Sequence, residues 1–305
     1  MGEWEVLPIG IHPQGIESAE TQWYYTEWET AISLRKPRSK FSHKGTYGHA
    51  LMICGSYGKT GAAVLAARAC LRAGCGLVTA HLPKSGVAIM QTAFPEAMVS
   101  ADESETIITG IPLLDAYKAV GTGPGLGKAQ ETQIALHNLI KDCKIPLVID
   151  ADGLNILSER PEWLRLLPQG TILTPHPLEF ARLSGKSSSG YEMVNKALDF
   201  AKTYQVYVVL KGANTAIACP DGSCWFNSTG NPGMATGGSG DVLTGILTGL
   251  LAQGYTSLDA TLLGVYVHGL AADLWVASSS EEALLAGDIA DNLGKAFVSL
   301  RESNQ

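Results

Sequence analysis

From residue 41 onward, short apolar runs alternate with longer stretches whose apolar residues recur at helical spacing. Each short run has four or five residues, and glycines cluster in the turns between the runs. The runs cover residues 50–54, 77–81, 118–122, 146–150, 171–174, 206–210, 215–219 and 223–227. The helical stretches cover residues 60–73, 191–204, 241–252, 258–277 and 286–300. Strands separated by helices predict an α/β fold, a three-layer α/β/α sandwich around a mainly parallel central sheet.

The last two runs, 215–219 and 223–227, flank Pro220-Asp221-Gly222, and this spacing predicts an antiparallel hairpin. The other strands are expected to be parallel. Ligands of parallel sheets bind where the C-terminal ends of the strands meet. Because the glycine-rich and charged motifs of this chain all follow expected strands, we expect them to gather along one edge of the sheet.

The charge balance argues against two broad classes of partner. The 305 residues carry a formal net charge of −7 and contain no block of basic residues, so neither nucleic acid nor an anionic membrane surface is expected as a main partner. A bound phosphate must be held locally, by backbone groups and a few cations. Apolar residues make up 46% of the chain, which is enough for a sizeable core.

The six cysteines form no Cys-x-x-Cys pair, and most lie in apolar segments. They are Cys54, Cys70, Cys75, Cys143, Cys219 and Cys224. Reduced, buried thiols are the expected state, which predicts a cytoplasmic protein without a cysteine metal site. The N-terminus lacks the basic and apolar segments of a signal peptide, and polar residues interrupt the apolar stretch 242–277, so no membrane span is expected.

Residues 1–40 differ from the rest of the chain. They contain Trp23 and Trp28 among many charged residues, show little periodicity, and end in the basic segment 35–40. We therefore expect two parts, an N-terminal extension over 1–40 that packs on the outside and one large α/β domain over 41–305.

The segment Asn231-Pro-Gly-Met-Ala-Thr-Gly-Gly-Ser-Gly-Asp241 places four glycines within eleven residues, just before an apolar helix. A glycine-rich turn brings backbone N–H groups close to a ligand, and the positive end of the helix dipole favours an anion there. Asp241 is not needed to hold that anion, because its charge would repel it. The presence of Asp241 is explained if it is a general base that deprotonates a hydroxyl as this attacks a phosphoryl group. The alternative role of Asp241 is an ordinary N-cap.

Other distinctive loops also follow expected strands. Lys211-Gly-Ala-Asn-Thr215 places a cation where it can meet phosphate, although solvated lysines at turns are common. His176-Pro-Leu-Glu179 fixes a histidine between two prolines, and its glutamate can hold Mg²⁺ through water or simply favour a helix start. Asp150 and Asp152 suit metal or ribose contacts, with an N-cap at Asp152 as the alternative.

The segment Gly55-Ser-Tyr-Gly-Lys-Thr60 is not a P-loop, because Ile53 stands where the first glycine is required. It remains a strand–turn–helix junction that can meet a phosphate or a ribose, or it is an ordinary tight turn. Taken together, an anion-binding helix start, a lysine, a glutamate and a candidate base are the parts of a phosphoryl-transfer centre.

In this order, the motifs resemble those of the ADP- or ATP-dependent NAD(P)H-hydrate dehydratases, members of the ribokinase-like superfamily. The resemblance is carried by His43-Lys-Gly45, Gly55-Ser56, Thr60-Gly-Ala-Ala63, Gly123-Pro-Gly-Leu-Gly127, Asp150-Ala-Asp152, Thr174-Pro-His-Pro177, Lys211-Gly212 and the segment 231–241. Leu178 stands where the family usually has glycine, and Gly153 where it usually has alanine. Both departures lie near the expected substrate pocket and bear on its geometry.

The resemblance implies a ribokinase-like fold and a cofactor-repair activity. Family members return (6S)-NADHX or NADPHX, the hydrated forms of the reduced nicotinamide cofactors, to NADH or NADPH. They use ADP or ATP with Mg²⁺ to phosphorylate the 6-hydroxyl of the hydrated ring, and then phosphate is eliminated. The implied partners are the NAD(P)H hydrate and the nucleotide, and relatives suggest a homo-oligomer.

The resemblance also implies a role for individual residues. Asp241 would be the base that acts on the 6-hydroxyl. The anion hole would consist of Gly237, Gly238, Ser239 and Gly240. The nucleotide would contact Lys211, Gly212, Ala213, Asn214 and Thr215, together with Gly240. The hydrate would contact Ala63, Gly125 and His176, together with Asp241. Glu179 would reach Mg²⁺, through water, from the place of the glutamate in the superfamily's metal motif.

Two alternatives remain beside this interpretation. One is a hydroxymethyl-type vitamin kinase of the same superfamily, which would stop at the phosphorylated product; the Thr174-Pro-His-Pro177 motif disfavours it. The other is a catalytically silent nucleotide-binding protein, which the intact glycine-rich loop and Asp241 disfavour. Residues 1–40 also resemble the end of the epimerase domain that precedes this domain in bifunctional family members, which predicts that the chain is the dehydratase half of a larger protein.

Overall fold

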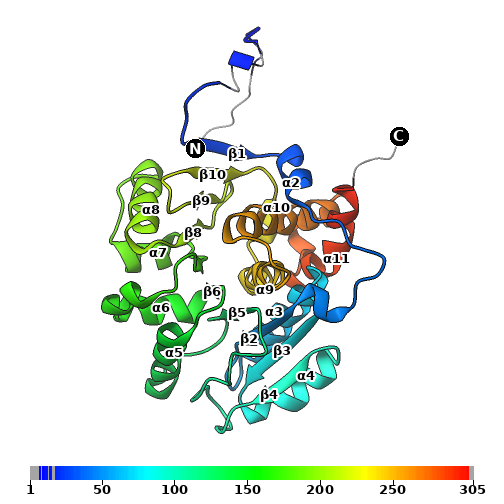
Figure 1. Ribbon diagram of the computed structural model, residues 1–305, viewed down its shortest axis with the longest axis vertical. Helices are drawn as coiled ribbons and strands as arrows, with labels where there is room; N and C mark the ends of the chain where they lie inside the picture. The colour runs from blue at the N-terminus through cyan, green and yellow to red at the C-terminus, as the bar shows by residue number, and fades with distance from the viewer. Residues whose placement is uncertain (1–6, 8, 13, 16–17, 302–305) are drawn as a thin grey trace.

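This computed structural model describes residues 7, 9–12, 14–15 and 18–301. Within them, ten strands form one sheet (Figure 1). Its strands are β1 (Trp23–Thr26), β2 (His49–Ile53), β3 (Leu77–Leu82), β4 (Met98–Ala101), β5 (Ala119–Thr122), β6 (Leu147–Ile149), β7 (Ile172–Leu173), β8 (Tyr207–Leu210), β9 (Ala216–Ala218) and β10 (Cys224–Asn227). They lie in the order β1-β10-β9-β8-β7-β6-β5-β2-β3-β4. β9 is antiparallel to β8 and β10, and the other described neighbours are parallel. The predicted hairpin and mainly parallel sheet are confirmed.

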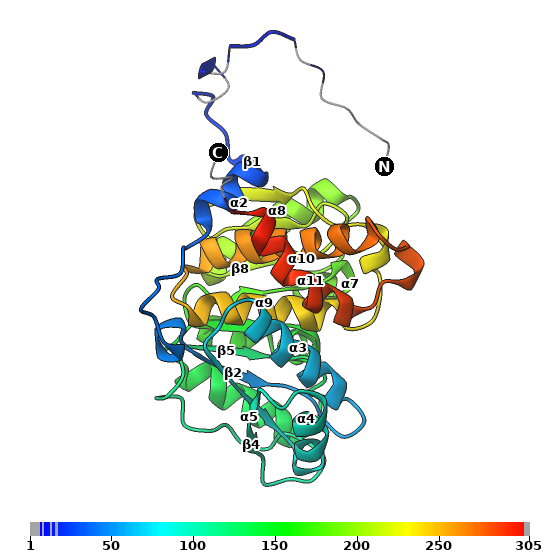
Figure 2. The same ribbon diagram turned by 90° about the vertical axis from the view of Figure 1, so that its right-hand side faces the viewer.

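Helices cover both faces of the sheet, as Figures 1 and 2 show. They are α2 (Trp28–Leu34), α3 (Thr60–Arg72), α4 (Val87–Ala93), α5 (Gln130–Asp142), α6 (Ala151–Glu159), α7 (Pro177–Ser184), α8 (Gly190–Tyr204), α9 (Ser239–Ala252), α10 (Ser257–Val276) and α11 (Ala286–Ser299). α3, α9, α10 and α11 pack on one face, and α5 to α8 lie on the other. This is the predicted three-layer sandwich. In the described part of the chain, no helix has both the length and the apolar character that crossing a bilayer requires.

The strand β2 shows why its sequence is apolar at nearly every position. Ala50 and Met52 belong to the buried cluster under α3, α9 and α10, whereas Leu51 and Ile53 belong to the cluster under α5 to α8. Successive side chains of a strand point to opposite faces of the sheet. A strand with helices on both faces therefore needs apolar residues throughout and lacks the alternation of a half-exposed strand.

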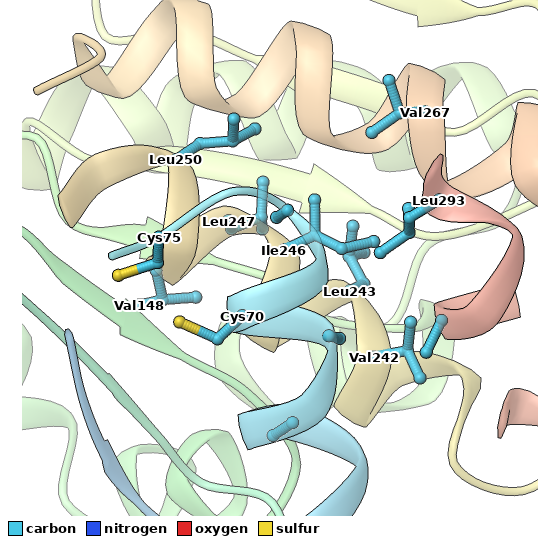
Figure 3. Packing of buried hydrophobic residues seen from close by; sticks show 14 of the residues in the cluster. Cys70, Cys75, Val148, Val242, Leu243, Ile246, Leu247, Leu250, Val267 and Leu293 are labelled. Carbon is cyan, nitrogen blue, oxygen red and sulfur yellow. The ribbon is translucent and has the colours of Figure 1, made fainter. Parts of the chain in front are cut away.

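The helix α9 is held unusually close to α3 by two glycines. A Cβ on Gly245 would lie 2.1 Å from the carbonyl oxygen of Ala66, and a Cβ on Gly249 would lie 2.5 Å from that of Cys70. Figure 3 shows the apolar side chains of α9 that pack around this contact. Since α9 begins with the glycine-rich motif, this packing fixes the position of that motif relative to the sheet.

The described part of the N-terminal region joins the sheet at its edge. β1 pairs in parallel with β10, and the indole Nε1 of Trp28 donates to the carbonyl of Ser299 at 3.3 Å. The backbone N–H of Lys36 donates to the hydroxyl of Tyr255 at 2.9 Å. Residues 23–36 are therefore tied to both the sheet and the C-terminal helices. Residues 1–6, 8, 13 and 16–17 of the expected extension lie outside the described residues.

Several elements have no counterpart in the sequence patterns above. They are β1, α2, α4, β4 and α5, whereas α6 and α7 lie where the alternatives above place helix starts, at Asp152 and Glu179. α4 has only seven residues, too few for a clear helical period, and β4 is a half-exposed edge strand of four residues. Short elements at the margin of a sheet bury little apolar surface, so their sequences carry a weak pattern.

Candidate active site

Residues from three parts of the chain meet at the buried carboxylate of Asp150, directly after β6. The ammonium of Lys211, directly after β8, donates to Asp150 Oδ1 at 2.9 Å. The hydroxyl of Thr244, on the second turn of α9, donates to Asp150 Oδ2 at 3.0 Å. The C-terminal ends of parallel strands and the start of α9 therefore share one edge of the sheet, as such folds require of a ligand site.

Asp241 is the third residue of α9, and the N-cap of that helix is Gly238, whose φ of +93° suits glycine. The N-cap interpretation of Asp241 is therefore wrong. No hydrogen bond or ion pair engages the Asp241 carboxylate within the described residues. Burial raises the pKa of Asp241 to about 7, with the charge of Asp150 adding to the rise and that of Lys211 opposing it. A carboxylate with a pKa near neutrality suits a general base.

The predicted anion hole, Gly237 to Gly240, forms the turn into α9. The first N–H groups of a helix have no partner within the helix and carry the positive end of its dipole. Gly240 lies directly against the ion pair: a Cβ there would be 3.2 Å from Asp150 Oδ2 and 3.3 Å from Lys211 Nζ. The helix start, the lysine and the buried carboxylate thus form one contiguous group.

The predicted nucleotide segment, Lys211 to Thr215, leaves β8 as a turn. The hydroxyl of Thr215 donates to the carbonyl of Gly212 at 3.1 Å, which closes the turn. Ala213 and Asn214 are exposed at its tip. The segment therefore presents backbone groups to solvent next to the Lys211 ammonium.

His176 and Glu179 cap α7 reciprocally. His176 Nδ1 accepts from the backbone N–H groups of Leu178 and Glu179 at 3.2 and 3.3 Å, and Glu179 Oε2 accepts from the N–H of His176 at 2.9 Å. Glu179 is buried, and its Oε2 lies 3.9 Å from Lys211 Nζ. The motif therefore has a structural role, and it also brings His176 to the Lys211 edge of the site.

Mg²⁺ fits this site only when it is bound by few protein groups together with waters and substrate phosphates. No group of three or more His, Cys, Asp or Glu side chains among the described residues is arranged to enclose a metal ion. Mg²⁺ in enzymes that handle nucleotides often keeps several waters and takes one or two carboxylates together with substrate phosphates. Glu179, beside the Lys211 ammonium, fits that mode, in which the ion arrives with the nucleotide.

The predicted substrate residues Ala63 and Gly125 flank the turn after β2. A Cβ on Gly55 would lie 3.3 Å from the Cβ of Ala63, and the hydroxyl of Ser56 donates to the carbonyl of Gly125 at 2.7 Å. Ala63 itself is fully buried. The structure thus brings Ala63 and Gly125 together, while His176 approaches from α7 on the other side of Asp150.

Asp152 ties two glycine loops to the start of α6. Its Oδ2 accepts from the backbone N–H of Gly127 at 2.8 Å and from the Lys59 ammonium at 3.1 Å. The N-cap of α6 is Asp150, so the N-cap alternative for Asp152 is wrong. Asp152 instead joins the loop after β5 to the N-terminus of α3.

Two side chains of α10 support the glycine-rich loop, and the sequence motifs did not identify either of them. The carboxylate of Asp273 accepts from the N–H of Gly230 and from the side-chain amide of Asn231, both at 2.8 Å. His268 is buried, its Nε2 lies 3.4 Å from Ser239 Oγ, and burial lowers its pKa to about 4. The signal available was that His268 and Asp273 interrupt the apolar second half of this helix.

The fold and the site define a ribokinase-like α/β protein with the groups of a phosphoryl-transfer centre. A ribokinase-like superfamily protein from Enterococcus faecalis has the same fold, with a TM-score of 0.81 at 24% identity over 93% of this chain and 98% of that one. The family model described as NAD(P)H-hydrate dehydratase matches residues 50–295. The chain belongs to the NAD(P)H-hydrate dehydratase family.

Two relatives illustrate the family. The bifunctional NAD(P)H-hydrate repair enzyme of Moorella thermoacetica is 40% identical over 99% of this chain and 59% of its own length. The chain thus spans about 59% of that bifunctional relative. The crystal structure of the ADP/ATP-dependent NAD(P)H-hydrate dehydratase from Bacillus subtilis, co-crystallised with ATP/Mg²⁺, matches with a TM-score of 0.80 at 32% identity, covering 91% of this chain and 99% of that chain. The family and fold expected from the sequence are confirmed.

Proposed function

We propose that the protein converts (6S)-NADHX and NADPHX to NADH and NADPH with ADP or ATP as the phosphoryl donor and Mg²⁺ as the metal ion. The observation that carries the proposal is the carboxylate of Asp241. It is free of protein partners among the described residues, has a pKa raised to about 7, and stands in the first turn of a helix beside the Lys211 ammonium. A base at an anion-binding helix start suits attack by a hydroxyl on a phosphoryl group.

The chemistry follows from the hydrated ring. Asp241 takes the proton of the 6-hydroxyl as the hydroxyl oxygen attacks the terminal phosphoryl group of the nucleotide. The bond from that phosphorus to the bridging oxygen breaks, and the nucleotide leaves with one phosphate fewer. The lone pair of the ring nitrogen then expels phosphate from the adjacent carbon, and loss of a proton from the neighbouring ring carbon restores the double bond. The protein mainly has to make a good leaving group and hold the ring, because the ring itself supplies the electron pair.

The roles of the binding residues complete the proposal. Gly237 to Gly240 hold the transferred phosphoryl group with backbone N–H groups. Lys211 to Thr215, with Gly240, contact the nucleotide. Ala63, Gly125 and His176 contact the hydrate. Mg²⁺ supplies charge neutralisation on the phosphates, and Glu179 holds it through water.

Cellular location and assembly are part of the same proposal. All six cysteines are buried and free, which favours a reducing compartment such as the cytoplasm. A homo-oligomer is part of the proposal because the resemblance to the family suggests one. Neither nucleic acid nor a membrane is proposed as a partner. We also propose that residues 1–40 are an extension left from a preceding epimerase domain and that 41–305 form the dehydratase domain.

The first experiment is an absorbance assay in the reduced-nicotinamide band. The protein is mixed with hydrated NADH or NADPH, Mg²⁺ and either ADP or ATP. A nucleotide-dependent rise is expected, reduced about 100-fold or more in Asp241→Asn, since general bases contribute about that factor. Asp259→Asn is the matched control, because Asp259 is also the third residue of its helix.

The other outcomes point to the other functions. Consumption of nucleotide with a hydroxymethyl substrate and no absorbance rise identifies a vitamin-type kinase. Bound nucleotide without any turnover identifies a silent binding protein. Full turnover in Asp241→Asn contradicts the assignment of the base.

A further inference from the structure

We propose that Asp150 is a positioning residue of this site: its buried carboxylate holds the Lys211 ammonium over the start of α9 and keeps a second negative charge beside Asp241. The inference rests on the proposed function and extends it to a residue outside the predicted anion hole, nucleotide segment and hydrate pocket.

Asp150 lies at the start of α6 but bonds to other parts of the chain. It occupies the N-cap position of α6, where an aspartate normally accepts from the N–H groups of its own helix, yet its side chain makes no such bond. Both oxygens are used elsewhere, Oδ1 by Lys211 at 2.9 Å and Oδ2 by Thr244 at 3.0 Å. The residue thus gives up a local stabilising contact for two contacts to distant parts of the chain.

The carboxylate of Asp150 is buried much more deeply than the ammonium of Lys211. The Asp150 side chain is 1% exposed, whereas the Lys211 side chain is 24% exposed. A buried carboxylate is costly unless it is paired and hydrogen-bonded. The pair is asymmetric: the carboxylate is enclosed and fixed, and the ammonium it holds still reaches solvent at the edge where phosphate would lie.

Gly240 closely approaches the ion pair of Asp150 and Lys211. A Cβ at position 240 would lie 3.2 Å from Asp150 Oδ2 and 3.3 Å from Lys211 Nζ. Thr244 also donates to the carbonyl of Gly240 at 3.1 Å, so the first turn of α9 and Asp150 share one hydroxyl. The carboxylate therefore sets the position of Lys211 and of the helix start together.

The charges around Asp241 affect the pKa of its carboxyl group. The groups that face the site are Asp150 and Asp152 from the start of α6, Lys211 after β8, Glu179 on α7, the Cys54 thiol after β2, and His268 on α10. Burial and the charges of Asp241 and Asp150 hold the pKa of Cys54 well above its usual value, and His268 has a pKa lowered to about 4, so both are neutral at pH 7. After burial, the charge of Asp150 is the largest contribution that raises the pKa of Asp241.

The test is Asp150→Asn, which keeps the shape of the side chain and removes its charge. We expect the kcat to fall about tenfold or more, because Lys211 and the first turn of α9 lose the carboxylate that holds them in place. We expect the midpoint of the acid limb of activity to move down by about one pH unit, since a neighbouring negative charge disfavours ionisation.

Two variants serve as matched controls. Thr244→Val removes the other hydrogen bond to Asp150 but keeps the charge, so the midpoint stays in place. Asp152→Asn removes a charge that contributes less to the pKa of Asp241, so the midpoint moves less than in Asp150→Asn. Thermal unfolding of each variant shows whether it is folded.

A spectroscopic measurement separates this inference from the proposed function. In protein labelled with ¹³C at the aspartate carboxyl carbons, the Asp241 signal is assigned from its loss in Asp241→Asn and is titrated without any substrate. Its midpoint should fall in Asp150→Asn even if no hydrate is turned over. An unchanged midpoint, or an unchanged kcat in a folded Asp150→Asn protein, overturns the positioning role. If Asp150→Asn does not fold, the titration is made in Lys211→Met, in which the midpoint should rise because the Lys211 charge lowers the pKa of Asp241, and an unmoved midpoint overturns the inference.

Discussion

The Nε2 atom of His268 lies 3.4 Å from the hydroxyl oxygen of Ser239, and both side chains are buried. This contact joins the middle of α10 to the first residue of α9. Because burial lowers the pKa of His268 to about 4, the imidazole is neutral at pH 7. A neutral ring in contact with the anion-binding turn adds no charge to it and holds its first residue in place.

Replacing His268 by glutamine is therefore expected to lower kcat/KM about tenfold, the effect of one lost hydrogen bond. The variant also tests the protonation state. The folded pKa of about 4 lies below the unfolded value of 6.5, so His268 destabilises the folded protein as the pH falls through this window. The loss of unfolding free energy in His268→Gln should thus be smaller at pH 4.5 than at pH 7, which urea unfolding at both values measures. Equal losses at both values contradict a neutral buried imidazole.

The activity of the unmodified protein is expected to rise with pH through a midpoint near pH 7. The reason is that Asp241 acts as a base only when ionised, and its pKa is raised to about 7. The measurement is kcat/KM for the hydrate between pH 5 and about 9 at saturating nucleotide and Mg²⁺. A midpoint near the usual carboxyl value would mean that another group limits the rate or that substrate binding removes the burial of Asp241.

The same carboxylate should lower stability at high pH. The folded pKa of Asp241, about 7, exceeds the unfolded value of 3.8, so the folded state binds the proton more tightly and loses stability as the pH rises between these values. Asp241→Asn removes this penalty and should be more stable than the unmodified protein at pH 8, by about 4 kcal/mol. Near pH 4 the two proteins should unfold at similar urea concentrations. A variant that is less stable at pH 8 would assign Asp241 a structural role.

The sequence was sufficient for the layered fold, the hairpin and the family, because each rests on patterns carried by many residues. It also singled out Asp241, because an acid at an anion-binding turn lacks a structural reason. It suggested metal or ribose contacts for Asp150 and could not show its ion pair, since the partners Lys211 and Thr244 are distant in the sequence. His268 was hidden for a similar reason: its partner Ser239 is remote in sequence, and one histidine in an apolar helix has no distinctive spacing.

Glu179 can be separated into its two roles by one conservative change. Glutamine can still accept from the His176 N–H and complete the cap of α7, but it is a much weaker ligand for Mg²⁺ than a carboxylate. In Glu179→Gln we therefore expect an unfolding temperature close to that of the unmodified protein and an increase of about tenfold in the Mg²⁺ concentration needed for half-maximal activity. An unchanged Mg²⁺ requirement would leave Glu179 as a cap alone.

The close contact of α9 with α3 is tested by adding a single methyl group. In Gly245→Ala the new Cβ would lie 2.1 Å from the carbonyl oxygen of Ala66, so one of the two helices must move. Overpacking of this kind costs about 3 kcal/mol, which urea unfolding would report. Activity should fall as well, because Asp241 lies one turn earlier on the same helix.

The control for this variant is Gly294→Ala on α11, where an added Cβ meets no atom within 4 Å. Alanine favours a helix over glycine by about 1 kcal/mol, so this variant should be slightly more stable and fully active. If both variants are stabilised alike, α9 and α3 are farther apart than the structure places them, and the helix start that carries Asp241 is not held by this contact.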